Sequence, residues 1–155
     1  KTIAENSHSL VYGGGNIGLM GILADSVLEH KGEVIGVIPD FLLQREVGHR
    51  GISRLEVVAS MHERKKRMAD LSDAFIALPG GWGTLDELAE ILTWKQLGLI
   101  YQPVALLNLN GFFDPLINQM RTMVQAGFLR SENLDLLILE STIDRLLESI
   151  AGQAR

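Results

Sequence analysis

Two glycine-rich turns in this sequence have the residue types of a phosphate-binding site. One is Gly13-Gly14-Gly15-Asn16-Ile17-Gly18-Leu19-Met20-Gly21, and the other is Pro79-Gly80-Gly81-Trp82-Gly83-Thr84. Each follows a short apolar run and opens a stretch of helical periodicity, so each is predicted to join the carboxyl end of a strand to the start of a helix. Helix N-termini present free N–H groups to anions, and glycine lets the backbone approach phosphate oxygens closely. The turns therefore indicate a phosphate site that includes Gly14, Gly15 and Gly80.

Tight packing of a strand against a helix is the alternative explanation for such turns. The first turn departs from a dinucleotide fingerprint, because Glu33, the acidic residue nearest the expected offset, precedes a strand instead of ending it. It also lacks the Gly-Lys-Ser/Thr ending of a nucleoside-triphosphate loop. Triphosphate chemistry is therefore disfavoured.

Two basic residues occur where the sequence predicts a buried helix face. In the predicted helix Met61–Leu71, Arg64 and Lys65 share the side that carries the apolar stripe. A buried arginine needs an anionic or hydrogen-bonding partner, because an unpaired buried charge is very costly. A bound anion would meet that need, and an internal ion pair, to Asp73 for instance, is the alternative. The other charged residues of this helix are predicted to be solvated: Glu63, Lys66, Arg67 and Asp70.

Glu87 is a candidate for chemistry beside the second turn. The run Thr84-Leu85-Asp86-Glu87 fits a helix capping box, in which the glutamate folds back onto the N-cap N–H. In the functional interpretation Glu87 lies one turn inside a helix whose start holds phosphate, and it reaches the ribose of a bound nucleotide. This predicted helix, Thr84–Leu97, is apolar on more than one side, so either its own sheet or a second subunit is expected to bury it.

Short apolar runs alternate with longer stretches of helical periodicity along the chain. Strands are predicted at Leu10–Tyr12, Val34–Ile38, Leu55–Ala59, Ala74–Leu78, Val104–Leu107 and Leu136–Leu139. Further helices are predicted at Gly18–Glu29, Phe112–Ala126 and Thr142–Ile150. Alternation of this kind is typical of crossover units, which predicts an α/β fold with a doubly wound parallel sheet in three α/β/α layers. Residues 1–155 are expected to form a single domain.

The start of the chain resembles the end of a helix that runs directly into the first strand. This suggests that a preceding first strand is missing from this chain, and an ordinary N-terminal extension is the alternative.

Bulk composition narrows the functional classes. A net charge of -5 argues against a nucleic-acid partner. With no cysteine, neither a disulfide scaffold nor a thiolate metal site can form. Four histidines lack the spacing of metal ligands: His8, His30, His49 and His62. The sequence shows neither a signal peptide nor a membrane-length apolar run, so a cytoplasmic protein without metal, cofactor or membrane partner is expected.

The motifs together resemble the LONELY GUY family of cytokinin riboside 5′-monophosphate phosphoribohydrolases, long mislabelled as lysine decarboxylases. The resemblance rests on Ser60-Met61-His62-Glu63-Arg64-Lys65, on Pro79 to Glu87 and on Thr93-Trp94, and it extends over nearly the whole chain. It implies a Rossmann-like fold and a homodimer with active sites at the subunit interface. Members normally begin with a strand that ends in a Cys-Gly-Ser-Ser-like turn, and this chain has none.

The resemblance also implies which residues carry the activity. The catalytic arginine and glutamate of the family fall on Arg64 and Glu87. Its substrate contacts fall on Glu46, Arg64, Lys65, Gly81, Trp82, Gly83, Thr84, Leu85, Asp86, Glu87 and Thr93.

The implied reaction is hydrolysis of the N-glycosidic bond of purine riboside 5′-monophosphates, AMP included. Glu87 is expected to stabilise the oxocarbenium-like ribose and to orient water, as carboxylates do in glycoside hydrolysis. Arg64 is expected to anchor the phosphate or the base and to ease negative charge on the departing purine. A non-catalytic nucleotide or cofactor carrier on the same fold is the alternative, and it needs neither residue. Lysine decarboxylation is disfavoured, because no Schiff-base lysine with a partner for the pyridine nitrogen can be singled out.

Overall fold

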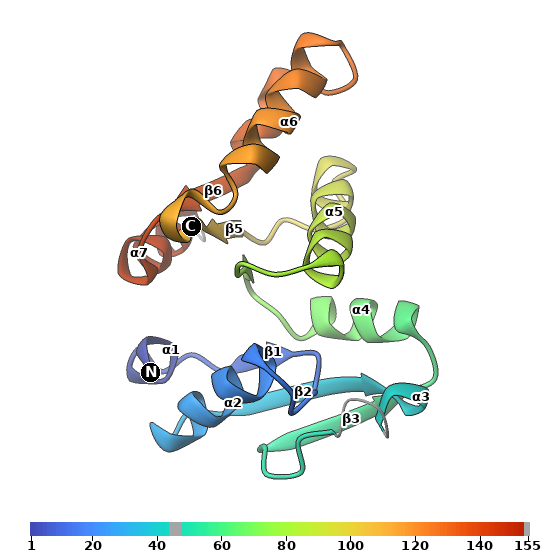
Figure 1. Cartoon of the computed structure of the whole chain (residues 1–155), viewed down its shortest axis with the longest axis vertical. Coiled ribbons are helices and arrows are strands. Elements are labelled where there is room, and N and C mark those ends of the chain that lie inside the picture. Colours follow the sequence, from blue (N-terminus) through green and yellow to red (C-terminus); the bar gives the residue numbers. More distant parts are fainter. Residues whose placement is uncertain (44–47, 154–155) are drawn as a thin grey trace. The chain divides into compact units, whose positions relative to one another are not determined.

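The computed structural model describes residues 1–43 and 48–153, which divide into two compact units, Lys1–Ser72 and Asp73–Arg155. We call them unit 1 and unit 2. Each contains an all-parallel, three-stranded sheet, in the order β1-β2-β3 in unit 1 and β4-β5-β6 in unit 2. Figure 1 traces unit 1 from blue to green and unit 2 from green to red. The predicted α/β fold with parallel strands is confirmed, whereas the single domain stays a prediction.

Unit 1 alternates helices and strands around β2. Its elements are α1 (Thr2–Glu5), β1 (Leu10–Tyr12), α2 (Leu19–Glu29), β2 (Val34–Pro39), α3 (Asp40–Leu43), β3 (Arg54–Val58) and α4 (Met61–Asp70). In the sheet, Leu10 lies opposite Val34, and Ile35 lies opposite Arg54. Every residue of β2 is buried, as expected for a strand covered on both faces. Buried apolar side chains form the core beneath α2: Tyr12, Ala24, Val27 and Val34.

Unit 2 has three layers, because alternate residues of its central strand face different helices. Its elements are β4 (Phe75–Ala77), α5 (Trp82–Gln96), β5 (Val104–Leu107), the 3₁₀ helix η1 (Leu109–Gly111), α6 (Asp114–Gln125), the 3₁₀ helix η2 (Ser131–Leu136), β6 (Leu137–Glu140) and α7 (Ile143–Gln153). One face of β5 packs toward α5 and α6 through Leu88, Val104, Leu106 and Phe113. The other face packs toward α7 through Ala105, Leu107, Ile138 and Leu146.

The largest boundary difference that concerns function lies at the second glycine turn. Helix α5 begins at Trp82 with Gly81 as its N-cap, two residues before the predicted start at Thr84. The predicted start was late because glycine is a poor helix former, and Gly83 hides the first turn in the sequence pattern. Short α3 was not predicted at all.

Among the described ranges, no helix combines the length and the apolar character needed to cross a bilayer.

Candidate active site

The first glycine turn follows β1 and leads into α2, and backbone geometry or packing requires several of its glycines. Gly14 has φ +76° and Gly18 has φ +66°, left-handed conformations that favour glycine. A Cβ at Gly21 would lie 2.4 Å from the carbonyl oxygen of Asn16, so the turn folds closely onto α2. Tight packing of the turn against the helix therefore accounts for some of its glycines, which is the alternative explanation given above for such turns.

Arg64 of α4 is buried beside the same turn, with 6% of its surface exposed. Its Nε donates to the carbonyl oxygen of Val37 at 3.2 Å, and its Nη2 donates to that of Gly13 at 2.8 Å. The guanidinium lies so close to the turn that a Cβ at Gly13 would sit 1.9 Å from Nη2. Carbonyl oxygens of the backbone thus fix the orientation of the guanidinium. The predicted burial of Arg64 is confirmed, and Lys65 beside it is half-buried.

A capped helix start holds Arg64 in this position. The Ser60 hydroxyl accepts a hydrogen bond from the Glu63 N–H at 3.1 Å, and the Glu63 carboxylate accepts one from the Ala59 N–H at 2.8 Å. These bonds fix the first turn of α4, from which Arg64 projects. Glu63 was predicted to be solvated surface and its capping role was missed, although Ser-x-x-Glu before a helix is a known capping signal.

A short segment after the undescribed residues 44–47 also contacts the first turn. Gly48 forms an antiparallel bridge with Gly15, and the His49 N–H donates to the carbonyl oxygen of Gly14 at 3.0 Å. The His49 ring is buried and lies 2.8 Å, from Nε2 to Oδ1, from Asp25 of α2. No sequence pattern indicated this role, because His49 and Asp25 are 24 residues apart in the chain. Predicted Glu46 lies outside the described residues.

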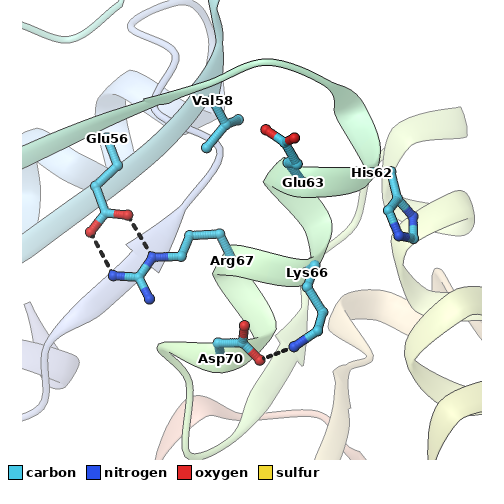
Figure 2. A pocket seen from close by; sticks show the side chains of 7 residues that line it. All are labelled: Glu56, Val58, His62, Glu63, Lys66, Arg67 and Asp70. Carbon is cyan, nitrogen blue, oxygen red and sulfur yellow. Dashed lines mark hydrogen bonds and ion pairs between the residues drawn. The ribbon is translucent and has the colours of Figure 1, made fainter.

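Unit 1 also has a shallow charged pocket of about 350 Å³ between β3 and α4 (Figure 2). It is lined by Glu56, Val58, His62, Glu63, Lys66, Arg67 and Asp70. Arg67 donates from Nε and Nη2 to the Glu56 carboxylate at 2.6 and 3.0 Å. The hydrogen bond from Arg67 lowers the pKa of the Glu56 carboxyl below its usual value. Arg67 is therefore not the merely solvated residue that the helical pattern predicted, and Lys66 pairs with Asp70.

The second glycine turn precedes α5, and packing does not explain two of its glycines. A Cβ at Gly81 or at Gly83 would meet no atom of the described residues within 4 Å, and neither residue has a positive φ. A Cβ at Gly80 would meet the Thr84 hydroxyl oxygen at 2.2 Å, so only this glycine is needed for packing. In the part of the chain that the structure describes, the N-cap Gly81 makes no side-chain cap hydrogen bond to the start of α5. An open, uncapped helix start of this kind is suited to an anion.

Glu87 lies on α5, just over one turn from its first residue, and is half-buried. The capping-box alternative is wrong, because Gly81 and not Thr84 is the N-cap. Of the other predicted contacts, Trp82, Leu85 and Asp86 are exposed. Further along the helix, the Thr93 hydroxyl donates to the carbonyl oxygen of Ala89 at 2.7 Å.

Comparison with known proteins places these features in context. The family model described as "possible lysine decarboxylase" matches residues 20–150. The chain is 46% identical over 147 residues to the cytokinin riboside 5′-monophosphate phosphoribohydrolase LOG of Oryza sativa subsp. japonica, covering 95% of this chain and 61% of that protein. It is 43% identical over 152 residues to a cytokinin riboside 5′-monophosphate phosphoribohydrolase of Arabidopsis thaliana, covering 98% of this chain and 71% of that protein. The chain thus spans about three-fifths of the length of two of the rice relatives that it matches, the one named above included.

One solved structure is similar to this chain in fold, and at this low sequence identity the likeness supports the fold assignment only. The molybdenum cofactor carrier protein of Chlamydomonas reinhardtii superposes with a TM-score of 0.69 at 22% identity, covering 98% of this chain and 81% of that chain.

Proposed function

The chain belongs to the LONELY GUY family, whose model carries the description "possible lysine decarboxylase", and from that membership we propose that it hydrolyses the N-glycosidic bond of purine riboside 5′-monophosphates. The substrates are cytokinin riboside 5′-monophosphates and AMP, and the products are the free base and ribose 5-phosphate. The identities of 43% and 46% to proteins named for this activity support the proposal.

The start of α5 is the observation that carries the proposal. Among the described residues, no atom lies within 4 Å of a Cβ placed at Gly81 or Gly83, and the N-cap Gly81 provides no side-chain cap for the helix. The first N–H groups of a helix have no partner within the helix, and they carry the positive end of its dipole. We assign the 5′-phosphate to these N–H groups, and its binding energy would position the ribose for cleavage.

Two charged residues supply the chemistry in this proposal. Glu87, about one turn inside α5, would stabilise positive charge on the ribose at C1′ and orient the attacking water. Arg64 would bind the phosphate or the base and stabilise negative charge on the departing purine. Its two bonds to main-chain carbonyls hold the guanidinium in one orientation, which is the preorganisation that electrostatic catalysis requires.

We also propose that the working unit is a homodimer formed in part by α5, with residues 1–155 acting as one domain. Trp82 and Leu97, at the two ends of this helix, are 88% and 64% exposed. Trp94, on the same helix, is half-buried. These exposed apolar side chains are candidate contacts with a second copy of the chain, and two-fold pairing is the commonest arrangement of soluble oligomers.

Incubation of the purified protein with AMP and with isopentenyladenosine monophosphate tests the proposed reaction. We expect release of adenine or of isopentenyladenine together with an equal amount of ribose 5-phosphate. Glu87→Gln should abolish most of the turnover, whereas Glu148→Gln, an exposed carboxylate on α7 of the same unit, should leave it unchanged. Tight nucleotide binding without base release would instead indicate the carrier. Release of carbon dioxide from lysine with added pyridoxal phosphate would indicate the decarboxylase.

A further inference from the structure

His49 is a buried polar side chain that the proposed reaction does not use. Among the described residues, His49 and Arg64 are the buried side chains of polar or charged type, with exposures of 7% and 6%. Burying an imidazole costs free energy unless its nitrogens are hydrogen-bonded. The hydrogen bonds made by His49 therefore indicate which parts of the structure the buried ring holds together.

Both ring nitrogens of His49 have partners, and these partners define the position of its hydrogen. Nδ1 accepts a hydrogen bond from the Gly51 N–H at 3.2 Å, so the ring hydrogen resides on Nε2. Nε2 then donates to Oδ1 of Asp25 at 2.8 Å. The side chain of Asp25 is 57% exposed on α2, so the pair joins a buried ring to a helix surface.

The same histidine is bonded through its backbone to the first glycine turn. Its N–H donates to the carbonyl oxygen of Gly14, at 3.0 Å, while Arg64 donates to the preceding carbonyl, that of Gly13, at 2.8 Å. Two consecutive carbonyls of one turn are thus held by His49 and by Arg64. A shift of the turn that breaks the first bond moves the acceptor of the second.

The charge of Asp25 also acts on Tyr12, at the base of this turn. Tyr12 is the last residue of β1 and directly precedes Gly13. Burial, and next the charge of Asp25, raise the pKa of the Tyr12 hydroxyl to about 12. Asp25 therefore lies close enough to the turn for its charge to act there.

We propose that Asp25 and His49 form a positioning pair, which holds the first glycine turn and through it keeps the Arg64 guanidinium aligned for the riboside monophosphate. The pair acts through Arg64 and does not itself contact the reacting atoms. The catalytic consequence rests on the proposed function, whereas the effect on Arg64 is a property of the unliganded protein.

Hydrogen exchange of the Arg64 Nε–H tests the pair without any substrate. This hydrogen is bonded to Val37 and buried, so its ¹⁵N-resolved signal, assigned by its loss in Arg64→Lys, should be protected in the wild type. Asp25→Ala removes the acceptor at an exposed helical position and should speed this exchange at least about tenfold. Asp25→Asn keeps an acceptor oxygen and should restore protection. Glu29→Ala, an exposed carboxylate one turn further along α2, is the matched control.

Turnover of AMP by the same variants provides the second measurement. Asp25→Ala should lower kcat about tenfold or more while KM changes less than about threefold, because misalignment affects the reacting geometry more than binding. Asp25→Asn and Glu29→Ala should stay close to the wild type. If Asp25→Ala does not fold, His49→Asn, which keeps the bond to the Gly51 N–H and loses that to Asp25, replaces it in both measurements.

The two hypotheses fail in different ways. A wild type that releases no base from any riboside monophosphate refutes the proposed function, and the exchange measurement then still decides the positioning pair. Unchanged protection of the Arg64 Nε–H in Asp25→Ala refutes the pair. An equal loss of kcat in Asp25→Asn and Asp25→Ala also refutes it, because a retained acceptor should have restored the alignment.

Discussion

Gly13→Ala should lower both the thermal stability and the activity of the protein, because of the single methyl group that it adds. The new Cβ would lie 1.9 Å from Nη2 of Arg64, and an ordinary van der Waals contact begins at 3.4 Å, so the guanidinium must retreat by about 1.5 Å. That movement breaks the 2.8 Å bond to the Gly13 carbonyl. Gly13 does not have a positive φ, so alanine there causes no backbone strain and the steric effect can be measured alone.

The magnitude follows from the bond that is lost. A hydrogen bond to a charged group contributes about 1.5–3 kcal/mol, and here the donor stays buried. In a domain of this size a destabilisation of about 2 kcal/mol lowers Tm by about 4–8 °C. Displacement of a substrate-positioning group by about 1 Å can cost about 10²-fold in rate, so we expect a similar loss in kcat/KM for AMP.

Thermal denaturation and an adenine-release assay on the same preparation test this prediction. Gly152→Ala is the matched control, because a Cβ at that position of α7 meets nothing within 4 Å among the described residues. It should leave turnover unchanged and keep or slightly raise Tm. A Gly13→Ala protein with wild-type Tm and wild-type kcat/KM would show that Arg64 is not held against the turn.

Further perturbations test other parts of the account. Glu87→Gln should lower kcat for AMP by at least about 10²-fold with an unchanged circular dichroism spectrum, and a near wild-type rate would remove Glu87 from the mechanism. Adenosine should be a much poorer substrate than AMP in both kcat and KM, and equal kcat/KM values would refute the phosphate site at α5. Tyr12→Phe should raise the free energy of unfolding by about 1 kcal/mol, because the buried Tyr12 hydroxyl has no hydrogen-bond partner among the described residues. Because the folded-state pKa of Tyr12 is raised to about 12 from 10, the wild type should also lose stability from pH 10 to pH 12 relative to Tyr12→Phe, and parallel pH curves from denaturant titrations would contradict this. Leu97→Glu should shift the mass measured by light scattering toward the monomer and lower activity with it, and an unchanged mass would count against α5 as an interface.

Local patterns in the sequence were sufficient for the elements of the fold and for most candidate residues. Strand β5 was predicted at its observed bounds, Val104–Leu107, because a strand buried on both faces is a continuous apolar run with clear ends. Arg64 was selected because helical periodicity places it on the apolar side of α4, and the structure confirms that it is buried. These properties depend on residues within a few positions of each other, which is why sequence reasoning reaches them.

Tertiary structure alone decided how those residues are held. The two carbonyl oxygens that accept from Arg64, those of Gly13 and Val37, lie 51 and 27 residues away in the chain, so no local pattern could identify them. The bond between His49 and Asp25 joins residues that are 24 positions apart. His49 belongs to no sequence motif, and only the folded chain shows that its buried ring is bonded to α2. The capping box proposed for Glu87 failed for the same reason. The pattern Thr-x-x-Glu satisfies the local rule, but the chain enters the helix earlier, at Trp82. Spacing along a chain limits which contacts can form, and only the packing of strands and helices determines which of them do.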